Sequence, residues 1–155
     1  MEKTNVMRIL DQKKVSYQPH YYGTETAIGG MELAETLGKD PNRVFKTLVS
    51  VSSTNKYYVF DIPVNRELNL KKAAKAVGEK KIEMLKQAQL LPLTGYIHGG
   101  CSPIGMKKFF TTTFDQSVEG LETVTFSAGK IGYQVELSPD DLKKVIRYTT
   151  ADLCD

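Results

Sequence analysis

The sequence predicts an α/β protein of the mixed α+β kind, in which helices flank one mixed sheet. Helix-like and strand-like segments are interleaved along the chain without strict βαβ alternation. Two apolar runs, VFKTLVSV at 44–51 and KYYVFDIP at 56–63, flank a short STN stretch and are typical of a β-hairpin. The 155 residues, of which 41% are hydrophobic, are enough for a single domain, residues 1–155, with a core of its own.

The first segments indicate a helix followed by an extended stretch. Residues 3–14 place Val6, Ile9 and Leu10 at helical spacing, which predicts a helix. Residues 15–22, VSYQPHYY, are rich in aromatic and β-branched side chains and predict a strand or an extended segment.

A second helix is expected at 25–37, just before the hairpin. Its apolar positions Ile28, Met31 and Leu33 recur at helical spacing, and Gly38 is typical of a helix end. The sequence KDPNR that follows, up to the first hairpin strand, predicts a turn.

The chain after the hairpin predicts helix, then loop, then strands. Residues 69–89 have a helical pattern that Gly78 divides into two pieces. A glycine-rich loop is expected at 95–105. Three strand-like runs follow, at 108–114, 122–129 and 132–138: KFFTTTF, ETVTFSAG and GYQVELS.

A final helix is expected over SPDDLKKVIRY, residues 138–148. Ser138 is a favourable N-cap, and Pro139 suits the first helical position. Asp140 and Asp141 lie where carboxylates stabilise the helix dipole.

Several classes of protein are disfavoured by composition. The first ten residues, MEKTNVMRIL, are charged and lack the apolar run of a secretory signal. The longest uncharged stretch, 87–106, contains prolines and glycines and does not resemble a membrane span. Cys101 and Cys154 have no metal-binding spacing, and no Walker or dinucleotide motif is present. We therefore expect a cytoplasmic protein without a metal or cofactor.

The basic residues are concentrated in one segment. The net charge is +3, but residues 66–86 carry seven Lys or Arg against three Glu, a net of +4, which leaves −1 for the rest. This local excess predicts contact with an anionic partner, although a solvated helix face would show the same pattern.

Lys46 is the first candidate for a functional side chain, because it interrupts the apolar run 44–51. A buried ammonium is unfavourable unless something pairs with it. In one interpretation it lies on an edge strand and extends to water. In the other it points into a cleft and binds a carbonyl, carboxylate or phosphate group as a fixed positive charge.

The loop GGCSPIG at 99–105 is the second candidate. Gly99 and Gly100 allow positive φ and close backbone approach, and the N–H groups of 99–102 suit an anion-binding nest. An ordinary tight loop is the alternative. Cys101 is either a nucleophile paired with one of two histidines, His20 or His98, or a small loop residue. We favour the latter, since no catalytic triad can be recognised.

These segments together resemble a known family, and the resemblance extends over nearly the whole chain. The family is the YbaK/EbsC aminoacyl-tRNA deacylases, which are related to the editing domain inserted in bacterial prolyl-tRNA synthetases. The chain is most similar to the Cys-tRNA(Pro) deacylase branch. The resemblance rests on four runs, LGKDPNRVFKTLV, NLKKAAKAVGEKKIEM, TGYIHGGCSPIGMKK and SAGKIGYQVELSPDDLKKV, at 37–49, 69–84, 94–108 and 127–145.

The resemblance implies a barrel-like mixed sheet flanked by helices, and it assigns roles to residues. It implies Lys46, Gly99 and Gly100 as catalytic positions. It implies a substrate pocket made of Tyr22, Thr47, Cys101, Ser102, Pro103 and Ser127. An acidic pocket residue of some relatives corresponds to Gln134 here, so that role is not carried over. Many relatives have an aliphatic residue at the position of Cys101, which argues against a catalytic thiol.

The resemblance also implies a substrate, a mechanism and partners. The expected activity is hydrolysis of mischarged Cys-tRNA(Pro), with the thiol of the tRNA-bound cysteine attacking its own carbonyl. The partners would be tRNA(Pro) and prolyl-tRNA synthetase. Separately from the resemblance, the basic excess of residues 66–86 predicts phosphate contacts from Lys71, Lys72 and Lys75, to which we add Lys107 and Lys108. Two alternatives stay open: a deacylase for another small amino acid such as alanine, and a non-catalytic RNA-binding or regulatory protein on the same fold.

Overall fold

Two sheets form the framework of the protein in the computed structural model, which describes residues 2–23 and 27–155. One sheet has the strand order β1-β7-β6 and is antiparallel; the other has the order β4-β2-β3-β5-β8 and is mixed. Their strands are β1 (Gln18–Tyr21), β2 (Phe45–Ser52), β3 (Tyr57–Pro63), β4 (Ile82–Met84), β5 (Thr111–Asp115), β6 (Val124–Ser127), β7 (Tyr133–Leu137) and β8 (Thr149–Ala151). The expected mixed α+β class is confirmed.

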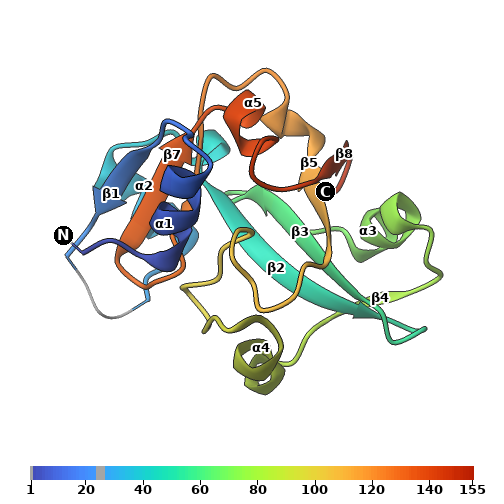
Figure 1. The fold of residues 1–155 in the computed structure, drawn as a ribbon. Helices are drawn as coiled ribbons and strands as arrows, with labels where there is room; N and C mark the ends of the chain where they lie inside the picture. The colour runs from blue at the N-terminus through green and yellow to red at the C-terminus, as the bar shows by residue number, and fades with distance from the viewer. Residues whose placement is uncertain (1, 24–26) are drawn as a thin grey trace.

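A backbone bridge joins the two sheets within the described residues. Val44, just before β2, makes a parallel bridge with Thr125 of β6. In Figure 1 the small sheet lies at the left beside α1 and α2, and the β2–β3 hairpin extends from there towards α3 and β4 at the right. The helices are α1 (Asn5–Gln12), α2 (Gly30–Leu37), α3 (Leu70–Val77), α4 (Gln87–Thr94) and α5 (Pro139–Leu142).

The β2–β3 hairpin separates two parts of the core. Phe45 and Val49 face the main cluster, which lies between the sheets and includes Phe126. The opposite face of the hairpin carries Phe60 and Ile62, which pack in a second cluster with α3. Because side chains alternate along a strand, Lys46 lies on the α3 side of the hairpin.

Three helix ends that the sequence predicts are found. The Ser138 hydroxyl accepts a hydrogen bond of 3.1 Å from the Asp141 N–H at the start of α5. Gly38 and Gly78 adopt left-handed backbone at the ends of α2 and α3, with φ of 66° and 73°. Glycine has no Cβ to oppose this conformation, so both helices stop there.

Three of the expected helices are wrong in extent. The helix expected at 25–37 begins at Gly30, and residues 25 and 26 of that prediction lie outside the described residues. Within 79–89, where a continued helix was predicted, Ile82–Met84 form the strand β4. Its partner is the Ser50–Ser52 end of β2, an edge that β4 covers, and Ile82 is buried there. The helix expected over 138–148 is limited to Pro139–Leu142, and the strand β8 follows it.

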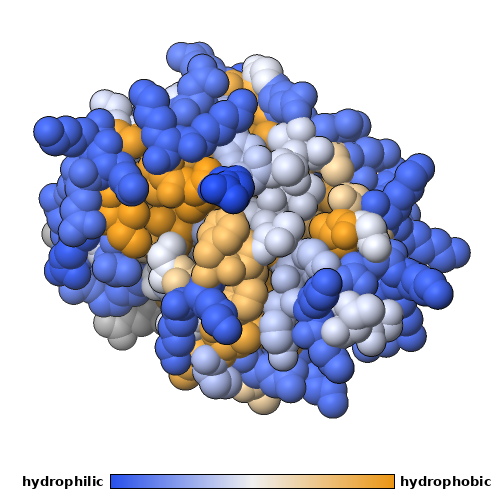
Figure 2. Space-filling model, turned by 45° about the vertical axis from the view of Figure 1, so that its right-hand side comes forward, coloured by the Kyte–Doolittle hydropathy of each residue, from blue (hydrophilic) through white to orange (hydrophobic). Residues whose placement is uncertain are grey.

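Most of the visible surface is hydrophilic, as Figure 2 shows, with apolar areas between charged side chains. Within the described residues, no helix combines the length and apolar character that crossing a bilayer requires.

Candidate active site

Four polar side chains from four strands form one row, and Lys46 is one of them. Extending the isolated parallel bridge between Val44 and Thr125 by two residues on each strand, we infer that Lys46 lies beside Ser127. Ser127 pairs with Gln134 of β7, and Gln134 pairs with His20 of β1. Residues paired in this way project from the same face of a sheet. The fold thus brings together positions far apart in the sequence.

The Lys46 ammonium is only weakly neutralised. Its side chain is 30% exposed, and its Nζ lies 3.9 Å from Oε1 of Glu67, whose side chain is 84% exposed. An exposed ion pair at this distance contributes little to stability. The lysine is therefore a positive charge that an anionic ligand group can approach, and it does not lie in the fully apolar environment that its strand predicted.

The neighbours of Lys46 in the row are more buried. Ser127 Oγ accepts a hydrogen bond of 3.1 Å from the Gly129 N–H. Gln134 is 2% exposed, and its Oε1 has no hydrogen-bond partner among the described residues. Tyr22 extends β1 by donating its N–H to the Gly132 carbonyl, 3.0 Å away, and is half-buried. These positions line the same end of the small sheet.

The glycine pair lies at this end too, but its two members differ. Gly99 has φ of +86°, and a Cβ there would lie 2.5 Å from the Cβ of Ala27. Gly100 is outside the left-handed region and does not use the positive φ that glycine allows. A Cβ on Gly100 would lie 3.2 Å from the backbone N of Ile131, in the turn between β6 and β7. Gly100 is therefore required because the backbone of the β6–β7 turn approaches it closely.

Polar groups of the loop already make hydrogen bonds within the protein, which leaves fewer of them for an anion than a nest requires. The Gly100 N–H donates to the Ile97 carbonyl at 3.0 Å. The Ser102 hydroxyl accepts from the Ile104 N–H at 3.3 Å, and Ser102 and Pro103 are buried. Gly100 and Ser102 therefore use these groups to hold the loop in shape.

Cys101 is poorly suited to nucleophilic attack. It is 8% exposed. Burial, together with the nearby carboxylate of Asp61, raises the pKa of the Cys101 thiol to about 12. Because the thiolate is the nucleophilic form of cysteine, this thiol is inert at neutral pH. The placement agrees with a structural role for Cys101.

Asp61 is a residue that sequence reasoning missed. It is fully buried in β3, its Oδ1 accepts a 2.5 Å hydrogen bond from the Thr47 hydroxyl, and its Oδ2 has no partner in the described part of the chain. Burial raises the pKa of Asp61 to about 8, and the Thr47 hydrogen bond opposes part of that rise. Thr47 faces away from Lys46, towards the main core. The acid within the apolar run YYVFDIP was the available signal.

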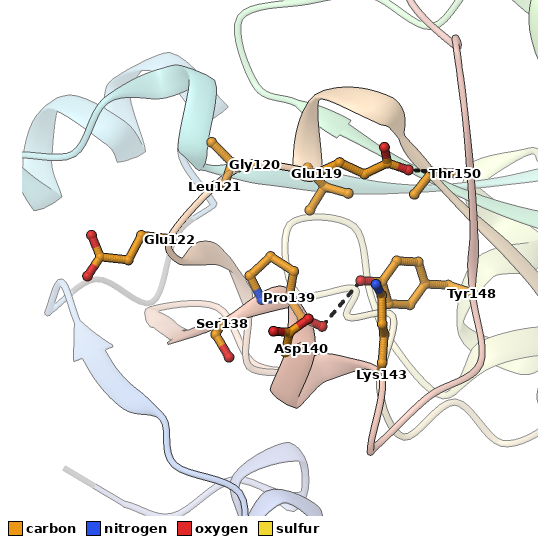
Figure 3. Close-up of a pocket in the computed structure, with 11 residues that line it drawn as sticks. Glu119, Gly120, Leu121, Glu122, Ser138, Pro139, Asp140, Lys143, Tyr148 and Thr150 are labelled. Atoms are coloured by element: carbon orange, nitrogen blue, oxygen red, sulfur yellow. Dashed lines mark hydrogen bonds between the residues drawn. The ribbon is translucent and has the colours of Figure 1, made fainter.

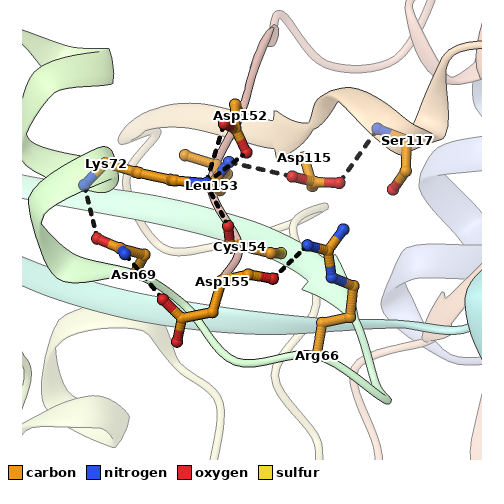
Figure 4. A network of polar contacts seen from close by, with 9 residues as sticks. All are labelled: Arg66, Asn69, Lys72, Asp115, Ser117, Asp152, Leu153, Cys154 and Asp155. Carbon is orange, nitrogen blue, oxygen red and sulfur yellow. Dashed lines mark hydrogen bonds and ion pairs between the residues drawn. The ribbon is translucent and has the colours of Figure 1, made fainter.

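The five lysines expected to contact tRNA have different surroundings. Lys71 and Lys75 are exposed on α3, and Lys107 and Lys108 are exposed after the glycine-rich loop. Lys72 Nζ instead donates to the Cys154 carbonyl at 2.7 Å and pairs with Asp152 at 3.0 Å. Figure 4 shows this network, in which Lys72 anchors the C-terminal residues to α3. The Lys72 ammonium is thus already bound to groups of the protein itself.

A cavity of about 580 Å³ lies away from these residues, between the loop 118–122 and α5. Glu119, Glu122 and Asp140 line it against a single Lys143, as Figure 3 shows. This acidic excess would repel RNA phosphates. In the described part of the chain, no three His, Cys, Asp or Glu side chains gather as ligands for a metal ion.

Comparison with known proteins identifies the family. The family model described as "Aminoacyl-tRNA editing domain" matches residues 27–145. The Enterococcus faecalis protein named "Putative Cys-tRNA(Pro)/Cys-tRNA(Cys) deacylase EbsC" is 46% identical over 140 residues, which are 90% of this chain and 85% of that protein. The proline–tRNA ligase of Shouchella clausii is 30% identical over 118 residues, which are 76% of this chain but 20% of the ligase.

The fold has a match among solved structures. A crystal structure described as "a putative trans-editing enzyme for prolyl tRNA synthetase" superposes with a TM-score of 0.81 at 23% identity, covering 97% of this chain and 94% of that one. The resemblance noted from the sequence motifs is confirmed. The chain belongs to the family of aminoacyl-tRNA editing domains, the enzymes that deacylate mischarged tRNA.

Proposed function

We propose that this enzyme hydrolyses Cys-tRNA(Pro), acting separately from prolyl-tRNA synthetase. The observation that carries the proposal is the 46% identity to the Enterococcus faecalis protein, whose printed name gives Cys-tRNA(Pro) as a substrate. The similarity to part of a proline–tRNA ligase supports the same tRNA. The proposal also includes association of this separate chain with the synthetase.

The chemistry that such a site must supply is modest. An aminoacyl ester is already activated, so the main requirements are a correctly placed nucleophile and stabilisation of the charge that develops on the carbonyl oxygen. The weakly neutralised Lys46 ammonium supports a role in charge stabilisation. Gly99 packs closely against Ala27 and Gly100 against Ile131, which fixes the shape of the loop that would lie beside the ester.

The nucleophile would come from the substrate. The sulfur of the tRNA-bound cysteine attacks its own carbonyl carbon, so a C–S bond forms and the C–O bond to the ribose breaks. The thiol proton ends on the released ribose hydroxyl, and water then opens the cyclic thioester. The buried, protonated thiol of Cys101 supports this route over attack by the enzyme.

Phosphate contacts would come from the exposed lysines of α3. The helix packs on the face of the hairpin that carries Lys46, and Glu67, the ion-pair partner of Lys46, lies just before it. Lys71 and Lys75 are exposed there and suit the tRNA backbone. We exclude Lys72 from the proposed phosphate contacts because its ammonium already contacts the C-terminal residues.

A second substrate, Cys-tRNA(Cys), is favoured by one specific observation. It also stands in the printed name of the Enterococcus faecalis relative. If the nucleophile is the cysteine thiol, the chemistry does not depend on which tRNA carries the ester.

Deacylation of a panel of charged tRNAs tests the proposal. The panel comprises Cys-, Ala- and Pro-tRNA(Pro) together with Cys-tRNA(Cys). We expect rapid loss of both cysteinyl esters and survival of the prolyl ester. Preference for Ala-tRNA(Pro) would instead favour a deacylase for another small amino acid. Binding of all four without turnover would favour a non-catalytic RNA-binding protein.

A further inference from the structure

An apolar and basic surface borders the Gly99–Gly100 loop. Three large apolar side chains in the segments that enter and leave this loop are strongly exposed: Phe109 at 57%, Leu91 at 51% and Ile97 at 50%. Lys107 and Lys108 precede Phe109 in the chain and are also exposed. We call these five residues the α4 surface. Such exposed apolar groups next to cations indicate a binding surface.

Contacts between two chain segments hold Lys107 against the end of α4. The Lys107 N–H donates to the Thr94 carbonyl at 3.0 Å, and Lys107 Nζ lies 3.5 Å from the Pro92 carbonyl oxygen. The Lys107 side chain also covers Gly95, since a Cβ on Gly95 would lie 3.2 Å from Lys107 Cγ. The segment before Phe109 therefore runs along the C-terminal end of α4.

The same pairing leads from Phe109 to the candidate active site. The Tyr96 hydroxyl donates to the Ile104 carbonyl at 2.5 Å, so the two segments stay side by side as far as the loop. Phe109 lies two positions after Lys107, and Gly99 lies four positions after Gly95. Six residues of fully extended chain would span at most about 20 Å, and the turns in these segments shorten the path, so a few unpaired nucleotides can cover it.

We propose that the α4 surface binds the unpaired 3′ end of tRNA, with a base stacked on the Phe109 ring and phosphates beside Lys107 and Lys108. The inference rests on the proposed function, because it assumes that the site receives an aminoacyl ester on a tRNA 3′ end. Proteins that hold single-stranded nucleic acid combine exposed aromatic faces with nearby cations in this way.

The neighbouring ring explains why Phe109 is available for stacking. Phe110 is half-buried, and its ring packs edge-on against Tyr57 with centroids 5.7 Å apart. This contact anchors the backbone at the start of β5, while Phe109 projects outwards. A purely apolar surface would suit a protein partner equally well. The two lysines directly before the ring, and the path into the loop, favour RNA.

Binding of uncharged RNA hairpins to variants of Phe109 tests the inference. One hairpin copies the tRNA acceptor stem with its unpaired 3′ end, and the other has the same stem with a blunt end. Binding is followed by fluorescence anisotropy at fixed low salt. We expect Phe109→Leu to weaken binding of the first hairpin about tenfold and to leave the blunt hairpin unaffected. Phe109→Tyr, which keeps the ring, should bind as the unchanged protein does.

Two results would overturn the inference. One is equal affinity of Phe109→Leu and the unchanged protein for the hairpin with the unpaired end. The other is unchanged RNA binding combined with weaker retention of prolyl-tRNA synthetase, which would make the surface a protein interface. Because the hairpins carry no amino acid, the outcome is independent of deacylation. Thermal unfolding of both variants confirms that they are folded, as expected for an exposed side chain.

Discussion

Replacing Asp61 with asparagine should change how stability depends on pH. Asp61 is fully buried, and its pKa rises from the ordinary 3.8 to about 8 because burial disfavours the carboxylate. Between these values the folded protein holds a proton on Asp61 that the unfolded chain has released. The free energy of unfolding therefore falls as pH rises through this window, by about 1.4 kcal/mol per pH unit. Asparagine carries no such proton, so the variant lacks this fall.

The measurement is urea unfolding of both proteins at pH 5 and pH 7. Over these two units the stability of Asp61→Asn should rise relative to the unchanged protein by about 3 kcal/mol. Other titrating groups are common to both proteins and cancel in the difference. Asparagine keeps an oxygen for the Thr47 hydroxyl, so the hydrogen bond at 2.5 Å has an acceptor in both proteins.

A second variant provides the control. Thr47→Val removes the hydrogen bond that favours the ionised carboxylate of Asp61. The pH range over which the free energy of unfolding falls should therefore extend to higher pH. The reasoning would be refuted if the free energy of unfolding changed equally between pH 5 and pH 7 in Asp61→Asn and in the unchanged protein. Equal changes would mean that Asp61 ionises in the folded state at its ordinary pKa.

The remaining predictions concern the site and the RNA contacts. Lys46→Ala should fold, since its ion pair is weak, but lose about a hundredfold in the deacylation rate; full activity would contradict the mechanism. Cys101→Ala should keep its activity, because the thiol is buried and protonated, and an inactive variant would revive attack by the enzyme thiol. Gly100→Val should reduce turnover more than stability, as measured by deacylation and thermal unfolding side by side. Neutralising Lys71 and Lys75 together should flatten the salt dependence of tRNA binding by a slope of about two, and an unchanged slope would remove α3 from the interface.

The candidate active site contains residues that sequence patterns could identify and a spatial arrangement that they could not. Lys46 stood out because an ammonium in an apolar run requires an explanation, and the motifs around it indicated the family. The sequence could not show that Ser127 and Gln134 lie in its row, because they are 81 and 88 residues further along. Their alignment depends on the parallel bridge between Val44 and Thr125. The roles of these residues remain predictions until the variants are measured.

The sequence by itself determined the features that depend on neighbouring residues. The β2–β3 hairpin, the Ser138 cap and the helix ends at Gly38 and Gly78 follow from local propensity and side-chain capping. These preferences act over a few residues, so they can be recognised without knowledge of the rest of the fold.

Only the tertiary structure decided the features that need a distant partner. Residues 82–84 have a helical pattern but form a strand, because the edge of β2 offers hydrogen bonds and burial to Ile82. Lys72 belongs to a basic segment but binds the Cys154 carbonyl, 82 residues away. Asp61 keeps its proton because the core encloses it. In each case the deciding energy comes from contacts between residues far apart in the chain, which local patterns do not contain.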